Sequence, residues 1–263
     1  MNTPTINDAH SHFLYDEPSI NSLPDLKHKI ICMSCEPSEW EIVSDLATKY
    51  PTLIIPAFGI HPWKAHIYDS QIVTPDSPLL SHLQTLISKH PNAVIGEIGL
   101  DFFATRITPT ETHSTEAIKQ AQLQVFQSFV TFAQLNYLPI SIHCVKAFEE
   151  TKQILLSKTK EGNSKIMFHS YGGNLTMTRH LLPILEVYFS FSHLLNASKW
   201  RERVVQQIPR TRILVESDFH SLEGAQEALQ QMCRLVETVH EGFNAEEANK
   251  NFERFLVPKK RPQ

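Results

Sequence analysis

Two histidines separated by one residue, His10 and His12, lie near the N-terminus in the segment Asp8-Ala9-His10-Ser11-His12. Alternate side chains of a β-strand project to the same face, so both imidazoles could reach one metal ion from an extended segment. A surface or core-edge histidine pair beside a turn would show the same spacing. The pair alone therefore leaves metal binding and a structural role open.

Further ligating or catalytic side chains stand where later apolar runs end. Glu97 is embedded in the glycine-flanked run Ile95-Gly96-Glu97-Ile98-Gly99, where burial of an unpaired carboxylate would be costly. His143, His169 and Asp218 each close or follow another short apolar run. A lone histidine in such a place is more often a hydrogen-bonded structural residue. Five predicted strands that deliver His, Glu or Asp to one rim, however, indicate a shared site.

The elements that must position these side chains alternate regularly along the chain. The predicted strands are Thr5–Asp8, Lys29–Ser34, Thr52–Gly59, Ala93–Ile98, Pro139–His143, Lys165–His169, Val187–Phe191 and Arg212–Glu216. The predicted helices are Ser38–Tyr50, Pro78–Lys89, Glu116–Asn136, Ala147–Ser157, Leu175–Leu185, Lys199–Gln207, Gly224–His240 and Ala245–Leu256.

Eight strands, each followed by a helix, indicate a parallel sheet, because parallel neighbours need crossover connections. Closing them into a (β/α)8 TIM barrel is the simplest arrangement for 263 residues, and we expect a single domain over residues 1–263. An open doubly wound sheet is the alternative, but no glycine-rich phosphate loop follows the first strand. In a barrel, the candidate ligands would share the carboxyl-terminal face, where barrel enzymes place their sites.

Composition and charge narrow the function classes. A hydrophobic content of 41% with 20% charged residues is typical of a soluble protein with a substantial core. A net charge of −4 argues against a protein that coats nucleic acid with Lys and Arg, but permits an enzyme that binds a phosphate ester locally. Without a signal peptide, a membrane-length apolar run or a disulfide-like cysteine framework, we expect a cytoplasmic protein with no membrane association.

Several motifs together resemble the TatD family of metal-dependent hydrolases, which are related to the amidohydrolases. The resemblance covers nearly the whole chain. It rests on Asp8-x-His10-x-His12, Gly59-Ile60-His61-Pro62-Trp63, Gly96-Glu97-Ile98-Gly99-Leu100-Asp101-Phe102, Leu138-Pro139-Ile140-Ser141-Ile142-His143, Phe168-His169-Ser170-Tyr171-Gly172-Gly173, Glu216-Ser217-Asp218 and Asn251-Phe252-Glu253-Arg254-Phe255.

The resemblance implies a centre of two divalent metal ions. It assigns one ion to His10, His12 and Asp218 and a second to His143 and His169. Glu97 would bridge them, and a carboxylate offers the two oxygens that a bridge needs, whereas a neutral imidazole does not. No Lys occupies that position, so a carbamylated-lysine bridge is not expected. Imidazole and carboxylate ligands suit Zn, Mn, Fe or Mg and do not choose among them.

In such a centre a metal-activated water would attack a phosphoester in line. Asp218 is the candidate general base, since it could take the proton of the water while touching a metal. The resemblance places His61 near the scissile phosphate, as a substrate-binding residue; packing on Pro62 and Trp63 in a turn is its alternative. Asp101, as a neighbour of the ligands, and Arg106, as a loop cation, are weaker candidates.

The chain departs from the family pattern around the centre. Many relatives carry a Ser-Arg-Asp-like segment after the histidine that aligns with His143, whereas this chain reads Cys144-Val145-Lys146-Ala147. Lys146 can replace the charge of the missing arginine but not its two-pronged geometry. Phe219-His220 replaces a small-residue and proline pattern, and His220 could approach the metals or the substrate. These changes leave substrate preference open.

Two further sequence features are assigned no role in the site. Cys32-Met33-Ser34-Cys35 is a C-x-x-C motif, but no second cysteine pair could complete a structural zinc site. Lys259-Lys260-Arg261 is interpreted as a solvated tail. 

Three functions are compatible with the sequence. The first is a deoxyribonuclease that removes nucleotides from the 3′ ends of single-stranded DNA. The second is a hydrolase of a smaller phosphoester, ester or amide, in keeping with the acidic pI and the missing arginine. The third is a partner-binding barrel without turnover, against which the complete ligand set argues.

Overall fold

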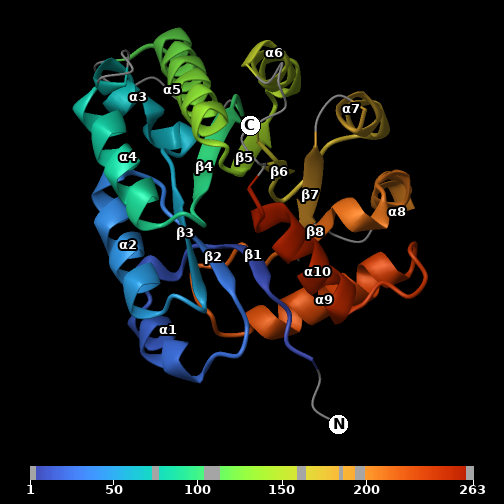
Figure 1. The fold of residues 1–263 in the computed structure, drawn as a ribbon. Helices are drawn as coiled ribbons and strands as arrows, with labels where there is room; N and C mark the ends of the chain where they lie inside the picture. The colour runs from blue at the N-terminus through green and yellow to red at the C-terminus, as the bar shows by residue number, and fades with distance from the viewer. Residues whose placement is uncertain are drawn as a thin grey trace, which may run out of the picture.

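The computed structural model describes residues 4–72, 77–103, 113–158, 164–183, 186–192 and 199–258. Its eight parallel strands follow one another in chain order around a nearly closed barrel (Figure 1). They are β1 (Asp8–Ser11), β2 (Ile30–Met33), β3 (Ile54–Phe58), β4 (Val94–Asp101), β5 (Ile140–Val145), β6 (Ile166–Phe168), β7 (Val187–Phe191) and β8 (Ile213–Val215). The predicted (β/α)8 barrel is confirmed, and the open doubly wound sheet is not found.

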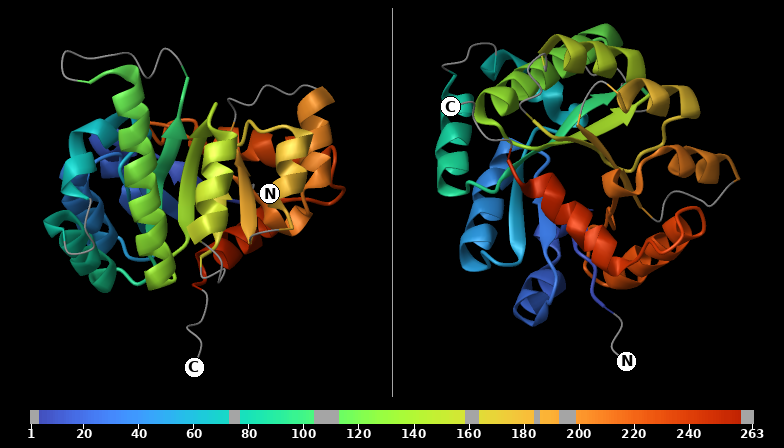
Figure 2. Two further views of the ribbon diagram at one scale, coloured as in Figure 1. Left: turned by 90° about the horizontal axis from the view of Figure 1, so that it is seen from above. Right: turned by 45° about the vertical axis from the view of Figure 1, so that its right-hand side comes forward.

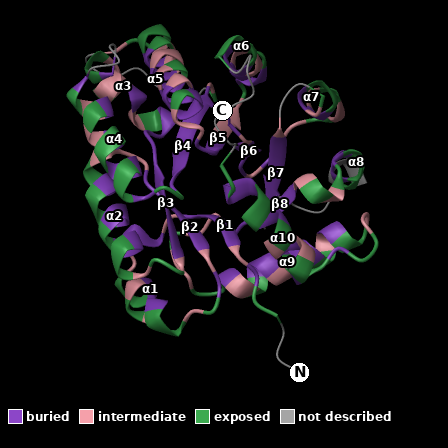
Figure 3. Cartoon of the chain, viewed as in Figure 1, coloured by how far each residue is buried: buried purple, intermediate pink, exposed green. Residues whose placement is uncertain are grey.

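Most of the helices surround the barrel on its outer side, while the last one lies across one end of the barrel (Figure 2). They are α1 (Glu17–Ser22), α2 (Trp40–Lys49), α3 (Ala65–Tyr68), α4 (Pro78–Lys89), α5 (Thr115–Asn136), α6 (Phe148–Lys158), α7 (Leu175–Leu181), α8 (Lys199–Gln207), α9 (Ala225–Glu237) and α10 (Ala245–Leu256). The strands are buried almost throughout, while the outer faces of the helices are exposed (Figure 3). This burial explains why the strands read as continuous apolar runs in the sequence.

The interior of the barrel is a packed core that extends onto the last helix. Phe252 and Phe255 of α10 belong to the same buried cluster as inward-facing strand residues such as Met33, Met167 and Tyr188. Asn251 fixes the helix in place by donating to the backbone oxygen of Ile213 at 2.9 Å. Because side chains fill the interior, the barrel is a scaffold and not a pore, and chemistry must occur at a rim.

Polar bonds connect the first and last strands near the carboxyl-terminal rim. The His12 amide donates to the Phe219 carbonyl at 2.7 Å, and the Asp218 amide donates to the His10 carbonyl at 3.0 Å. The buried Asp8 carboxylate accepts from the amide and the hydroxyl of Ser217, at 2.9 and 2.6 Å. These bonds bring Asp218 beside the two histidines of the first strand.

The prediction of a first strand at Thr5–Asp8 is wrong, because β1 begins where that prediction ends. The amides of Ile6 and Asn7 donate to the side chains of Gln226 and Asn249, at 3.0 and 2.7 Å, instead of to a neighbouring strand. Sheet pairing starts at Asp8, which lies opposite Ile30. His10 therefore lies within the strand and His12 directly after it.

The other predicted strands and helices are found, with shifts at their ends. β4 and β5 continue two to three residues beyond the predicted ends, and α7 stops at Leu181 instead of Leu185. Two short helices, α1 and α3, were not predicted. Each spans six residues or fewer, and α1 is marked mainly by the Asp16 side chain, which accepts from the Ser19 amide. Such short segments show too few turns for a periodic pattern.

Candidate metal centre

The first group of candidate ligands comes from the two ends of the sheet. The Nε2 atoms of His10 and His12 lie 2.9 Å apart. Asp218 follows β8 with a φ of 57°, and its Oδ1 lies 3.8 Å from both of these nitrogens. The side chain of Asp218 is 17% exposed, whereas that of His10 is fully buried. Three donor atoms thus converge, and the most accessible one belongs to the aspartate.

Glu97 of β4 lies between this group and a second one, with its two oxygens facing opposite ways. Oε2 lies 3.5 Å from Nε2 of His10 and 3.3 Å from Nε2 of His12. Oε1 lies 2.8 Å from Nδ1 of His143 and 2.7 Å from Nε2 of His169. The structure therefore brings all six predicted ligands together, with Glu97 in the middle.

A local irregularity of β4 delivers this glutamate. Ile95 pairs with Ile140 and Ile98 with Ile142, so the register shifts by one residue and β4 bulges around Glu97. The backbone of β3 approaches the bulge so closely that a Cβ at Gly59 would lie 2.4 Å from the Gly96 carbonyl carbon. Only glycine permits that contact, which accounts for the glycine before Ile60-His61.

The electrostatics of the cluster favour an ionised glutamate among imidazoles. Burial alone would raise the pKa of Glu97, but His169, His61 and His10 hold it well below its usual range. Burial opposes protonation of His169 as well, yet Glu97 and Glu216 raise its pKa well above the ordinary value. The mutual stabilisation shows that the buried carboxylate needs positive charge beside it, which either a protonated imidazole or a cation could supply.

Two further carboxylates support the second histidine group from outside. Glu216 is fully buried and lies 3.5 Å from Nδ1 of His169, while accepting from the Ser170 amide at 2.6 Å. Asp101 Oδ2 lies 3.4 Å from Nε2 of His143 and accepts from the Trp63 indole at 2.7 Å. Carboxylates in this position fix the ring orientation of metal-binding histidines. The weaker prediction for Asp101, a neighbour of the ligands, agrees with this placement.

Glu216 was quoted only as part of a motif and was given no role in the sequence analysis. A signal was present, because Glu216 and Asp218 are two residues apart at the end of the last strand. Alternate residues share a face, so both could point to the same site. The Arg106 and Lys259-Lys260-Arg261 predictions fall outside the described residues.

His61 lies at the edge of the cluster, beside the second histidine group. Its Nε2 is 3.4 Å from Oε1 of Glu97, and its ring centroid is 4.7 Å from that of His143. Its Nδ1 accepts from the Trp63 amide at 3.2 Å, so the ring proton of a neutral His61 is on Nε2. The histidine is buried and burial lowers its pKa, which favours this neutral, hydrogen-donating form.

The cysteines of the C-x-x-C motif point to different places. Cys32 is buried in β2, while Cys35 Sγ lies 3.6 Å from Nδ1 of His12, and both are free thiols. Cys35 also has ligand geometry with His12 and Glu97, a possibility that the sequence analysis did not consider. Burial raises the pKa of the Cys35 thiol, which therefore lies beside His12 as a neutral group.

His220 approaches the cluster, as the sequence suggested. Its ring stacks on His12 with centroids 5.2 Å apart and an interplanar angle of 21°. Lys146, which replaces the family arginine, is exposed and has a φ of 55° directly after β5. Both departures from the family pattern therefore lie at the mouth of the centre and not among its donor atoms.

The donor set fits divalent metal ions of borderline or hard character. Among the described residues, one possible ligand group joins His10, His12 and Asp218, and others join Glu97 with His10 and His169 or with His61 and His143. Imidazole nitrogens suit Zn and Fe, and carboxylate oxygens suit Mn and Mg. In the part of the chain that the structure describes, His169 Nδ1 and Glu216 Oε2 are buried atoms without a hydrogen bond, and Nδ1 lies 3.5 Å from the other oxygen of Glu216. A cation held by Nε2 of His169 would place the ring proton on Nδ1, facing this carboxylate.

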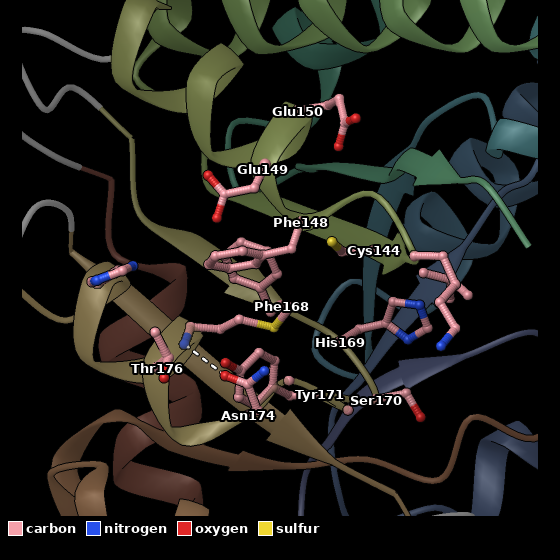
Figure 4. A pocket seen from close by; sticks show the side chains of 16 residues that line it. Cys144, Phe148, Glu149, Glu150, Phe168, His169, Ser170, Tyr171, Asn174 and Thr176 are labelled. Atoms are coloured by element: carbon pink, nitrogen blue, oxygen red, sulfur yellow. Dashed lines mark hydrogen bonds between the residues drawn. The ribbon is translucent and has the colours of Figure 1, made fainter.

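A cavity of about 760 Å³ opens next to His169, between the loops that follow β5 and β6 (Figure 4). Phe148, Phe168 and Tyr171 form its apolar part, and Glu149 and Glu150 at the start of α6 form part of its rim. The volume is that of a site for a small organic ligand. The candidate centre thus has an adjoining space in which a substrate could extend.

Comparison with models of known protein families shows to which family the chain belongs. A family model described as "TatD related DNase" matches residues 7–253. The chain belongs to the TatD family. Members of this family are metal-dependent hydrolases, so the match supports the metal-binding character of the centre and the resemblance read from the motifs.

Individual relatives differ in name. The chain is 26% identical to Cut9-interacting protein scn1 of Schizosaccharomyces pombe, over 88% of this chain and 92% of the relative. It is 24% identical to human deoxyribonuclease TATDN3, over 73% of this chain and 67% of the relative. It is 33% identical to the uncharacterized metal-dependent hydrolase YabD of Bacillus subtilis, over 50% and 48%.

Solved structures share the fold at low sequence identity. A TatD family hydrolase from Entamoeba histolytica superposes with a TM-score of 0.74 at 16% identity, covering 98% of this chain and all of the other. YjjV, a TatD homologue from Escherichia coli, superposes with a TM-score of 0.70 at 17% identity, covering 95% of each chain. Within the described part of the chain, no helix combines the length and apolar character that spanning a bilayer requires.

Proposed function

We propose that this protein is a two-metal phosphodiesterase that removes nucleotides from the 3′ ends of single-stranded DNA. The observation that carries the proposal is the central position of Glu97, whose two oxygens face two separate groups of donors. A carboxylate placed in this way can bridge two cations a few ångströms apart. Family membership and the deoxyribonuclease name of the human relative support the choice of substrate.

The distances support the ligand assignment that the family resemblance implies. His10, His12 and Asp218 would hold one ion and His143 and His169 the other, with Glu97 shared between them. Divalent ions bound there would lower the pKa of a water molecule and neutralise charge on the phosphate oxygens. Glu216 and Asp101 would hold His169 and His143 in their orientations. All of these side chains are buried or half-buried, which keeps them fixed before the substrate arrives.

The proton of the attacking water needs an acceptor, and Asp218 is placed for that role. It is the more accessible carboxylate of the cluster, and its Oδ1 lies next to the first histidine pair. The water oxygen would bond to phosphorus while Asp218 takes the proton of the water. The bond from phosphorus to the 3′ oxygen of the remaining strand would break, and this oxygen would take up a proton from solvent to form the new 3′ hydroxyl. The released nucleotide then carries the phosphate on its 5′ oxygen.

His61 would bind the phosphate that is being cleaved. Its Nε2 carries the ring proton, because Nδ1 accepts from a backbone amide, and it points toward the second histidine group. A neutral imidazole that donates to a phosphate oxygen orients the ester without adding a fixed charge. Replacing His61 by Asn should therefore raise KM for the substrate while the number of metal ions bound per chain stays the same.

The test compares the wild type with Asp218→Asn and with the surface control Asp45→Asn. Each is loaded with Mn²⁺, Mg²⁺ or Zn²⁺ and given single-stranded DNA labelled at its 5′ end. The wild type and the control should shorten the DNA stepwise from the 3′ end, and Asp218→Asn should lose at least about 100-fold of that rate. Internal cleavage, or unchanged activity of Asp218→Asn, would contradict the proposal.

A second candidate is hydrolysis of a smaller ester without DNA cleavage. Lys146 in place of an arginine lacks the two-pronged geometry of a phosphate clamp, which favours a site with few phosphate contacts. Turnover of a chromogenic phosphodiester with DNA left intact would support it. The name of the fission-yeast relative makes a non-catalytic partner-binding role a third outcome, recognisable as bound metal with no hydrolysis of either substrate.

A further inference from the structure

The cavity beside His169 has walls whose chemistry differs from that of the metal centre. It lies between the loops after β5 and β6, and His169 is the candidate ligand that lines it (Figure 4). A substrate whose phosphate sits among the candidate ligands would therefore place a neighbouring group in this cavity. The polarity and charge of the cavity walls indicate which kind of group could bind there.

One part of the wall is apolar and fixed. Phe148, Phe168 and Tyr171 are buried side chains that line the cavity, and the rings of Phe168 and Tyr171 pack with their centroids 6.0 Å apart. The Tyr171 hydroxyl lies 3.0 Å from Thr178 Oγ1, so this hydroxyl is already satisfied and the ring offers apolar surface. Met177 adds a flexible thioether at the same wall.

The rim is acidic. Glu149 and Glu150 form part of the first turn of α6, and both line the cavity. Glu149 is exposed and pairs with Lys152 at 2.5 Å, whereas Glu150 is half-buried. Carboxylates only accept hydrogen bonds and repel further phosphates. Because Glu149 is paired with Lys152, Glu150 is the carboxylate that the rim offers to an N–H donor of a bound group.

We propose that this cavity binds the base of the nucleotide at the scissile bond and prefers bases that carry an amino group. The apolar wall would contact the base, and Glu150 would accept a hydrogen bond from its amino group. Cytosine, adenine and guanine have such a group and thymine does not. The inference rests on the proposed phosphodiesterase function, because that function places the phosphate beside His169.

The experiment measures inhibition, so that it does not depend on cleavage of DNA. The Mn²⁺-loaded protein hydrolyses methyl p-nitrophenyl phosphate in the presence of dCMP, dTMP or deoxyribose 5-phosphate. We expect deoxyribose 5-phosphate to inhibit at least about 10-fold more weakly than dCMP, because it lacks a base. We expect dTMP to inhibit about 5-fold more weakly than dCMP. Equal inhibition by dCMP and deoxyribose 5-phosphate would overturn the proposal.

Three variants assign the effect to the cavity. Glu150→Gln should remove the preference for dCMP over dTMP, while Glu227→Gln, which changes an exposed carboxylate in the first turn of α9 outside the cavity lining, should keep it. Thr176→Trp, at an exposed position of the cavity wall, should raise the inhibition constant of dCMP to that of deoxyribose 5-phosphate. A dCMP preference that survives both Glu150→Gln and Thr176→Trp would refute recognition in this cavity.

Different results would refute the proposed phosphodiesterase function and the proposed base pocket. If metal-loaded protein hydrolyses neither DNA nor the chromogenic diester, the proposed function fails. Direct titration of dCMP and dTMP into the metal-loaded protein then still tests the cavity. If DNA is shortened but the terminal base has no influence on KM or on nucleotide binding, the function stands and the base pocket is wrong.

Discussion

Replacing Glu97 by Gln removes the charge between the two donor groups while keeping the size of the side chain. The amide oxygen can still serve one group, but the amide nitrogen can only donate and would face the other. A unit charge about 4 Å from a unit opposite charge is worth about 4 kcal/mol at an effective dielectric constant near 20. The loss of that interaction corresponds to roughly 1,000-fold weaker binding of at least one divalent ion.

The assay for Glu97→Gln is a metal titration followed by measurement of bound ions after desalting. The wild type should retain two ions per chain and Glu97→Gln one or none, while the metal-induced rise in Tm shrinks accordingly. The metal-free Tm should fall as well, because removing Glu97 leaves the buried imidazoles beside it without their partner, so the comparison uses the rise in Tm that metal produces in each protein. Glu227→Gln serves as the exposed control. Two tightly held ions in Glu97→Gln would refute the bridging role.

Three further variants test the positioning and the scaffold. Glu216→Gln should weaken binding of the ion at His169 by roughly 10–100-fold in a competition titration, and unchanged affinity would contradict its orienting role. Gly99→Ala should cost about 2–6 kcal/mol of unfolding free energy in urea, since its φ is 144° and a Cβ would lie 1.9 Å from the carbonyl oxygen of His143, whereas Gly172→Ala, with no atom within 4 Å, should be neutral. Burial lowers the pKa of His28 from 6.5 to about 4, so the unfolded chain binds the proton first and stability falls by up to about 3 kcal/mol as pH drops from 6.5 to 4. His28→Gln should flatten that part of the pH profile of urea denaturation, and an equally steep profile would show that other groups cause it.

The barrel could be predicted because its strands are buried on both faces and its long helices are amphipathic. The same local patterns failed where long-range contacts decide the structure. Side chains of Gln226 and Asn249, more than 200 residues away, take the amides of Ile6 and Asn7 and so delay the start of β1. No local sequence pattern predicts a contact between residues so far apart in the chain.

The sequence likewise predicts some features of the candidate site and not others. His10 and His12 are two residues apart, and their convergence follows from strand geometry alone. That the oxygens of Glu97 face two separate groups depends on a one-residue bulge, which the alternation of a regular strand does not predict. The position of Cys35 beside His12 likewise depends on how the chain turns after β2, so the C-x-x-C spacing gave no indication of it.

The central claim is that Glu97 lies between two metal ions, and anomalous X-ray diffraction from crystals of Mn²⁺- or Zn²⁺-loaded protein tests it most directly. The account predicts two anomalous peaks, one among His10, His12 and Asp218 and the other between His143 and His169, with one oxygen of Glu97 at each. A single peak, or two peaks of which neither contacts Glu97, would contradict it.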